Sequence, residues 1–355
     1  CKEEYDFPLR SNDVSLLVVE GVLNAGNGPT QILLSRTMKL DEVVQFKPVL
    51  QAQLTVEGKD NTSKPLSSAG NGNYTNPNLG MTIGTEYRLR IKTTDGKEYL
   101  SEWLVARNTP EIDSVTWKRT PAGLTVFNHT HDPSNNSRYY KWDYDETWQI
   151  NSVFPSDYVW VSGSTIIQGS LPSSCWKYGK ASTIIIGSSA QLQSDVITEL
   201  PAFFIADKSE KISVRYSVLM KQQTLSKKAY EYFSLMKKNT ESLGTIFDPQ
   251  PSELRGNIVN IADPSEIVIG YMNAAKVTQK RIFITAQQAN WSYPQNCSNI
   301  LIPNHPDTIR KYVPIYLPWG AVETGPGTVT DYYLSEPHCV DCTRRGGSPT
   351  KPSYW

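Results

Sequence analysis

Apolar and polar residues alternate over many short segments in the first third of the chain. The clearest run is Tyr87 to Lys92, where Tyr87, Leu89 and Ile91 share one face and would point inward. The Asp-Gly dipeptide at 95–96 follows, and it favours the tight turn of a β-hairpin. Further segments with strand character lie at 16–23, 31–36, 50–56 and 99–105. Short strands at this spacing are typical of a sandwich, so we predict an immunoglobulin-like domain over 14–109.

A second β domain is predicted over 110–290. Its clearest strand is 139–148, where Tyr140, Trp142 and Tyr144 alternate with polar residues, as in a strand with one packed and one wet face. We expect further strands at 182–186, 212–220, 267–271 and 277–284, and we interpret 153–174 as a long irregular excursion. This arrangement resembles a fibronectin-type sandwich.

One helix is predicted inside the second domain, near 226–243. Ser226 is a candidate N-cap, with Thr224 as the alternative. Ala229, Phe233 and Met236 form an apolar stripe. Gly244 is the expected C-cap.

The C-terminal tail, 291–355, is rich in proline. Because proline removes a backbone donor, we expect this tail to form no regular sheet and to pack irregularly on the second domain. The predicted fold is therefore all-β, with two β-sandwich domains, one inserted helix and an irregular tail. The prolines of the tail are Pro294, Pro303, Pro306, Pro314, Pro318, Pro326, Pro337, Pro349 and Pro352.

Composition and charge narrow the class of protein. Lys+Arg and Asp+Glu both number 35, so the formal net charge is zero, and the positive excess of a nucleic-acid-binding protein is missing. The 19 Tyr and 9 Trp fit an extracytoplasmic β protein. No apolar run is long enough for a membrane-spanning helix.

The first four residues suggest where the protein works. Cys1 at the start of the chain is the position that bacterial lipoproteins modify with lipid, and a lipid anchor would hold the chain on a membrane. Lys2, Glu3 and Glu4 resemble the surface-export signal of lipoproteins in the Bacteroidota. We therefore expect residues 1–13 to be a lipid-anchored tether and the protein to lie on the extracellular face of the outer membrane.

The other four cysteines are disulfide candidates. Outside the cytoplasm, paired cysteines are normally oxidised, and four cysteines allow three pairings that the sequence does not distinguish. The spacing of the last two also resembles half a zinc site, but no second such pair follows. The candidates are Cys175, Cys297, Cys339 and Cys342.

Two groups of polar residues invite a chemical interpretation. His129, His131 and Asp132 offer metal-ligand types, but their polar surroundings favour a solvated loop between strands. Asp143, Asp145 and Glu146 lie beside aromatic residues, as in a glycosidase cleft, but acids on the wet face of a strand are the commoner case.

Neither group is predicted to be a site. The sequence contains neither the Gly-x-Ser-x-Gly elbow of hydrolases nor a phosphate-binding loop. We predict no catalytic residue, no metal and no cofactor, and hence no enzyme.

Several motifs in order along the chain resemble a known family. They are SLLVVEG (15–21), YRLRI (87–91), DGK (95–97), YLS (99–101), PEIDSV (110–115), GTIFDPQP (244–251), GNI (256–258), VIGY (268–271), CVDCTRRGG (339–347) and KPSYW (351–355). Together they are similar to the Bacteroidota lipoproteins grouped as domain of unknown function 4249. The resemblance implies an outer-membrane lipoprotein associated with a TonB-dependent receptor-like barrel, and it supplies no catalytic residues.

The expected function is therefore that of a non-catalytic accessory subunit. Its partners would be the receptor-like barrel and associated lipoproteins, with substrate capture or scaffolding as its role. An accessory role in an outer-membrane protein biogenesis complex is the first alternative. A glycan-binding or glycan-active protein is the second, because exposed Trp and Tyr side chains could stack on sugars.

Overall fold

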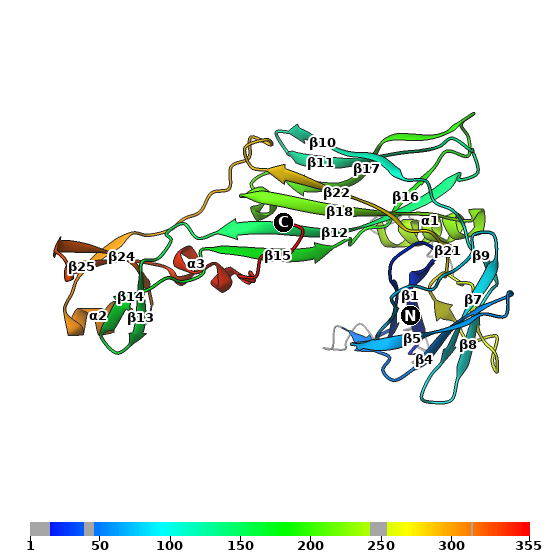
Figure 1. The fold of residues 1–355 in the computed structure, drawn as a ribbon, viewed down its shortest axis with the longest axis horizontal. Coiled ribbons are helices and arrows are strands. Elements are labelled where there is room, and N and C mark those ends of the chain that lie inside the picture. Colours follow the sequence, from blue (N-terminus) through cyan, green and yellow to red (C-terminus); the bar gives the residue numbers. More distant parts are fainter. Residues whose placement is uncertain (1–14, 39–45, 242–253, 314) are drawn as a thin grey trace, which may run out of the picture.

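The fold is all-β, as predicted, and it comprises two sandwich-like bodies and a smaller module at one end of the molecule (Figure 1). The computed structural model describes residues 15–38, 46–241, 254–313 and 315–355. Cys1, Lys2, Glu3 and Glu4 lie outside these residues, as does Gly244.

The first domain contains a twelve-stranded sheet among the described residues. Side chains from both halves of this sheet enter one core, so the sheet wraps around that core as the two layers of a sandwich do. Tyr87, Leu89 and Ile91 are buried in it, as their alternation predicts. Its strands are β1 (Leu17–Asn24), β2 (Thr30–Arg36), β3 (Lys47–Pro48), β4 (Gln53–Gly58), β5 (Ser63–Gly70), β6 (Asn73–Asn76), β7 (Glu86–Lys92), β8 (Glu98–Ser101), β9 (Leu104–Val105), β19 (Ile258–Asn260), β20 (Val268–Ile269) and β21 (Ala274–Ala275).

Three of these strands come from a part of the chain that we assigned to the second domain. β19 pairs with β8, and β20 and β21 pair in parallel with β1. The expectation that 267–271 closes the second domain is therefore wrong. A close backbone approach explains the pairing, because a Cβ on Gly270 would lie 2.0 Å from the carbonyl oxygen of Val19, and only glycine fits there.

The central domain is a sandwich of a three-stranded and a five-stranded sheet. Tyr140, Trp142 and Tyr144 of its longest strand face the core between the sheets, as predicted, and the Trp142 indole N–H donates to Gln222 at 2.7 Å. The first sheet contains β10 (Ile112–Thr120), β11 (Gly123–Asp132) and β17 (Asp195–Ala206), and the second contains β12 (Tyr139–Asn151), β15 (Ser174–Lys180), β16 (Ile185–Ser188), β18 (Arg215–Thr224) and β22 (Thr278–Thr285). The short 3-10 helix η1 (Glu210–Ile212) precedes β18.

Helix α1 (Lys227–Glu241) occupies the predicted position and lies where the central and first domains meet (Figure 1). The Ser226 hydroxyl accepts a hydrogen bond from Ala229 N–H at 3.1 Å, so Ser226 is the N-cap. Tyr232 of this helix is buried, and its hydroxyl accepts from the backbone N–H of Gly270 at 3.0 Å. The helix therefore joins the central domain to the strands that complete the first domain.

The third body, which we call the distal module, lies at the end of the long axis opposite the first domain (Figure 1). It contains the hairpin of β13 (Tyr158–Ser162) and β14 (Thr165–Gln168) and a three-stranded sheet in the order β23-β25-β24. The remaining elements are β23 (Ile300–Pro303), α2 (Pro306–Tyr312), β24 (Leu317–Gly325), β25 (Thr328–Ser335), α3 (Pro337–Val340) and the 3-10 helix η2 (Cys342–Arg345).

Two expectations for this region are wrong. The tail does build a regular sheet, because Pro303 ends one edge strand, Pro318 stands near the start of the other, and the central strand β25 contains no proline. The segment 153–174 contains a hairpin rather than only an irregular excursion. Proline is compatible with a sheet when it is confined to edge strands.

The last residues return to the central domain. Trp176 and Ser348 exchange backbone hydrogen bonds, and Tyr354 and Trp355 lie against the sheet that contains β12 and β22. Among the described residues, no helix is both long and apolar enough to cross a membrane.

Candidate functional site

The four cysteines form two disulfides, as expected, and the structure selects one of the three pairings. Cys175 pairs with Cys342, with Cα atoms 5.7 Å apart, and Cys297 pairs with Cys339, with Cα atoms 6.0 Å apart. Cys175 and Cys342 are fully buried with Ile150, so this disulfide fastens the distal module to the end of the central sheet.

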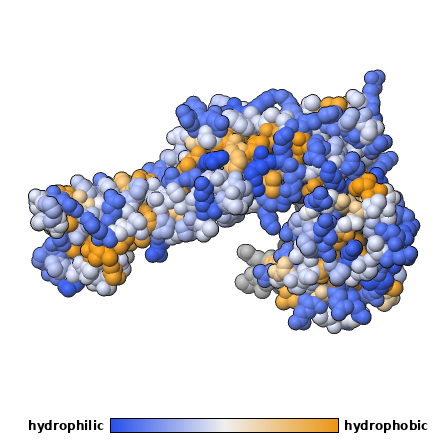
Figure 2. All heavy atoms as spheres, viewed as in Figure 1, coloured by the Kyte–Doolittle hydropathy of each residue, from blue (hydrophilic) through white to orange (hydrophobic). Residues whose placement is uncertain are grey.

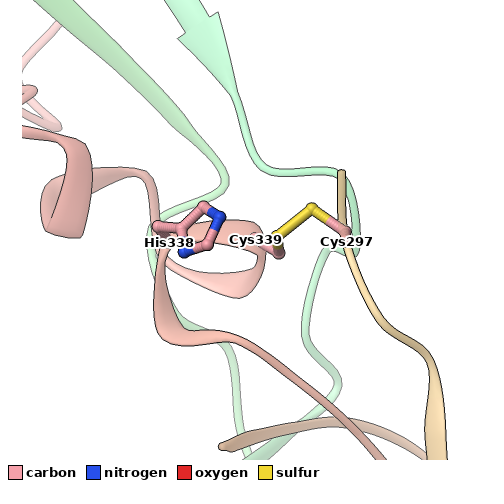
Figure 3. Close-up of side chains that lie close together, drawn as sticks. All are labelled: Cys297, His338 and Cys339. Carbon is pink, nitrogen blue, oxygen red and sulfur yellow. A yellow bond between two sulfur atoms is a disulfide. The ribbon is translucent and has the colours of Figure 1, made fainter. Parts of the chain in front are cut away.

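His338 lies beside the second disulfide (Figure 3). Its ring and the sulfur atoms of Cys297 and Cys339 offer ligand atoms that lie within 4.8 Å of one another. A metal site built on cysteine needs thiolates, and both sulfur atoms are committed to the disulfide. The group is therefore a structural link and not a metal centre while it is oxidised.

His129 and His131 lie on strand β11, so the expectation of a loop is wrong for them; Asp132 ends the strand and the loop follows it. His131 is exposed and its Nδ1 lies 2.8 Å from Asp113, which raises the pKa of the imidazole. Asp132 instead accepts hydrogen bonds from the turn that starts at Ser134. These three side chains have separate partners and form no common site.

The acids of β12 are also divided between partners. Asp143 and Asp145 pair with Lys141 and Lys221 on the half-exposed face. The expectation of a wet-face acid is wrong for Glu146, which points inward, is 5% exposed, and accepts from the Tyr216 hydroxyl at 2.9 Å. The three acids therefore share no cleft, and they lack the arrangement of a carboxylate pair that flanks a glycosidic bond.

The β13–β14 hairpin is the feature that distinguishes the distal module. Residues 158–176 contain no charged side chain. One face of the hairpin contains Tyr158 and Ile166, which pack toward the core of the module. The strand register places Val159 opposite Ile167 on the other face. A hairpin with one dry and one wet face would carry polar residues there, so both faces of this hairpin are unusually apolar.

We call the surface formed by Val159 and Ile167, with Val161 in the irregularity between Trp160 and Ser162, the apolar face. Val161 is 56% exposed and Ile167 is 49% exposed. Figure 2 shows hydrophobic residues gathered over the hairpin at this end of the molecule. Large exposed apolar side chains that cluster in this way usually mark a surface that another molecule covers.

The inward face of the hairpin borders a groove of about 480 Å³. Tyr158 and Tyr332 meet at the groove edge to edge, with ring centroids 5.6 Å apart. The Tyr158 hydroxyl donates to the carboxylate of Glu323, and this hydrogen bond raises the pKa of Tyr158. The groove is lined by Tyr158, Ile166, Gln168, Asn304, Glu323, Gly327, Thr328, Val329 and Tyr332.

The family model described as a domain of unknown function, DUF4249, matches residues 2–281. The chain belongs to the DUF4249 family. No curated protein matches the chain in sequence. Among solved structures, it is similar to the chitinase ChiA74 from Bacillus thuringiensis at 14% identity and a TM-score of 0.16, over 56% of this chain and 29% of the chitinase. Such a low score supports no conclusion about fold or activity.

The DUF4249 match includes the hairpin but ends within β22, before the three-stranded sheet of the distal module. Sequence reasoning identified the cysteines and missed both the apolar face and the groove. The signal for the apolar face was present in the uncharged run 158–176. No local sequence pattern predicts the groove, because the residues that line it come from segments that are far apart in the chain.

Proposed function

We propose that this protein is a lipid-anchored outer-membrane lipoprotein on the extracellular face, where it serves as a non-catalytic accessory subunit of a TonB-dependent receptor-like barrel complex. The observation that carries the proposal is the apolar face of the β13–β14 hairpin. Membership of the DUF4249 family supports it, since the sequence resemblance implies the same setting.

The apolar face favours a protein partner. Fully burying a side chain such as Val161 or Ile167 contributes roughly 1.5–3 kcal/mol, so covering both would be a substantial part of a docking energy. Charged residues are depleted in the cores of protein interfaces. The uncharged run 158–176 has this composition.

The shape of the molecule is compatible with such a role. The first domain, which follows the expected lipid anchor, and the distal module lie at opposite ends of the long axis (Figure 1). A chain tethered at Cys1 could therefore present the hairpin to a neighbouring barrel. In that position the subunit could capture substrate or act as a scaffold for the complex.

The test is purification of the tagged protein from native membranes in mild detergent. We expect a receptor-like barrel to co-purify, and the double variant Val161→Asp/Ile167→Asp to lose it by tenfold or more. Phe204→Asp is the matched control, because Phe204 is 53% exposed on β17 of the central domain, away from the hairpin. Circular dichroism of each variant verifies folding.

Each other outcome has a defined meaning. Co-purification with the barrel-assembly protein instead of a nutrient receptor would support the biogenesis alternative. A wild-type protein that purifies alone as a monomer would overturn the accessory role, and a hairpin variant that retains the barrel would overturn the docking face. Binding of the hairpin to lipid vesicles without any barrel would replace the protein partner by the membrane. An unmodified Cys1 in mass spectra of the N-terminal peptide would overturn the anchor.

A further inference from the structure

We propose that the groove on the inward face of the β13–β14 hairpin binds an uncharged saccharide. The groove is separate from the apolar face, since the two lie on opposite sides of the same two strands. The inference deepens the proposed function by naming a class of molecule that the subunit would capture, but its geometry does not depend on the barrel.

The walls of the groove match the two-sided chemistry of a sugar ring. Ile166 and Val329 are half-buried and offer an apolar floor to the C–H face of a sugar. Gln168, Asn304 and Thr328 are exposed and offer amide and hydroxyl groups to its hydroxyls. A few convergent polar groups over an apolar surface are what a small-molecule site usually provides.

Two of the polar groups are held in place. The Asn304 side-chain N–H donates to the backbone oxygen of Val329 at 3.0 Å, which leaves the amide oxygen in a set orientation. Glu323 accepts from the Tyr158 hydroxyl. Because a carboxylate accepts about four hydrogen bonds, Glu323 retains capacity for ligand hydroxyls. Preformed polar groups lose less entropy when a ligand binds.

Trp160 supplies an aromatic platform next to the groove. It lies directly opposite Ile166 in the hairpin register, and therefore on the same face as the groove. Its indole N–H donates to the Gly163 backbone oxygen at 3.1 Å, yet 39% of the residue stays exposed. An indole held in this way presents a rigid apolar surface that suits stacking on a sugar.

Charge limits the ligand to uncharged saccharides. Of the described residues that line the groove, Glu323 is the only charged one. A phosphate, sulfate or uronic acid would meet this carboxylate with no compensating cation. A simple ammonium ligand would use Glu323 but leave the amides and hydroxyls of the groove unmatched. The volume of about 480 Å³ lies in the lower part of the usual range for ligand sites, so we expect a short glycan or one end of a longer chain.

The test uses the full-length protein against a glycan array, followed by calorimetric titration with the neutral oligosaccharides that score highest. Acidic oligosaccharides and choline are included as charged probes. We expect at least one neutral glycan to bind, and Trp160→Ala, Gln168→Ala and Glu323→Ala each to weaken its affinity about tenfold or more. Glu199→Ala is the matched control, because Glu199 is an exposed acid of the central domain that pairs with Lys118.

The remaining outcomes would overturn the proposal. They are binding of only charged probes, affinity that is unchanged in all three groove variants, and the absence of any neutral ligand on the array. Failure of this inference is distinguishable from failure of the accessory role. Trp160→Ala and Glu323→Ala should retain the barrel, whereas Val161→Asp/Ile167→Asp should lose the barrel and retain the glycan. The free energy of unfolding of each variant verifies that the distal module still folds.

Discussion

The first domain and the distal module, at opposite ends of the molecule, are held together in different ways. Each end is assembled from two chain segments that are far apart in sequence. The first domain receives residues 258–275 as strands of its sheet, whereas the distal module combines the hairpin at 158–168 with residues 300–345. Backbone hydrogen bonds join the two segments of the first domain, whereas two disulfides hold together the region around the distal module.

The difference follows from the size of the cores. The distal core contains six buried hydrophobic residues among those described, and the core of the first domain is several times larger. A small core contributes too little burial to offset the conformational entropy of its own chain, and small domains commonly rely on covalent links. The disulfides are therefore expected where the sheet is smallest.

The surfaces of the two ends differ as well. On the outer face of the first domain, Glu57 pairs with Arg88 and Arg90, as expected of a strand that stays in water. On the hairpin of the distal module, apolar residues occupy the equivalent outward positions. This contrast identifies the hairpin, and not the first domain, as the surface to test for a partner.

The strongest test of the covalent link is Cys175→Ser/Cys342→Ser. The loop that this disulfide closes spans 167 residues, against 42 for Cys297–Cys339. We expect a loss of about 4 kcal/mol in the free energy of unfolding, and about 1 kcal/mol less for Cys297→Ser/Cys339→Ser, because loop entropy grows slowly with length. Urea unfolding followed by fluorescence measures both, and equal stability with and without a reductant would contradict the comparison.

A matching test at the other end is Gly270→Ala. Gly270 has a φ of +126°, and a new Cβ would meet the backbone of Val19, so the pairing of β1 with β20 would have to open. We expect a loss of about 3 kcal/mol from the combined clash and strain.

Gly84→Ala is the control for this variant, because Gly84 has a φ of +88° and open space around it. It should cost only about 1 kcal/mol. Amide hydrogen exchange localises the effect: the first domain should lose protection and the distal module should not. Equal losses in the two variants would show that the close approach is unimportant.

Much of this fold could be predicted from the sequence because local patterns encode it. The alternation through Tyr140, Trp142 and Tyr144 predicts the inward face of β12, and the cap at Ser226 predicts the start of α1. The partner of a short strand is a different matter. β20 consists of Val268 and Ile269, and two residues contain no periodicity that could tell one sheet from another.

The distal module could not be predicted for a related reason. The number of prolines in the tail does not reveal whether they fall on central or edge strands. Pro303 and Pro318 both stand on edge strands, where proline is compatible with a sheet. The cysteine pairing depends on which loops return to the central sheet. The sequence does not contain this information, so the three possible pairings are equivalent before the structure is known. The groove joins Gln168 to Glu323, and contacts at such a separation have no local signature.

A smaller effect on the free energy of unfolding is expected from Glu336. Its side chain links the start of α3 to the segment that precedes β23. Its carboxylate accepts from the Ser298 hydroxyl at 2.6 Å and from the Ser298 backbone at 2.8 Å, and these hydrogen bonds lower the pKa of Glu336 to about 2 from 4.5. A carboxyl group whose pKa is lower in the folded than in the unfolded state stabilises the fold at pH values above its unfolded pKa. For Glu336 this contribution is lost as the pH falls from about 4.5 through about 2.

Glu336→Gln should therefore cost about 1 kcal/mol at pH 7, after allowance for solvent screening at a partly exposed carboxylate. The difference between this variant and the wild type should vanish near pH 2. Urea unfolding at several pH values measures it. A pH-independent difference would show that Glu336 acts through packing and not through its charge. Glu199→Gln, at an exposed acid of the central domain, should show a smaller effect.

The smallest expected effect concerns the return of the C-terminal residues to the central domain. The Arg281 guanidinium lies 3.7 Å from the centroid of the Tyr354 ring, and the Tyr354 hydroxyl meets Thr147 at 2.7 Å. Because Tyr354 is 41% exposed, we expect this cation–π pair to contribute only about 0.5–1 kcal/mol. A double-mutant cycle of Arg281→Gln and Tyr354→Leu isolates the coupling energy of the pair. A coupling of several kcal/mol would contradict the small contribution expected of this half-exposed pair.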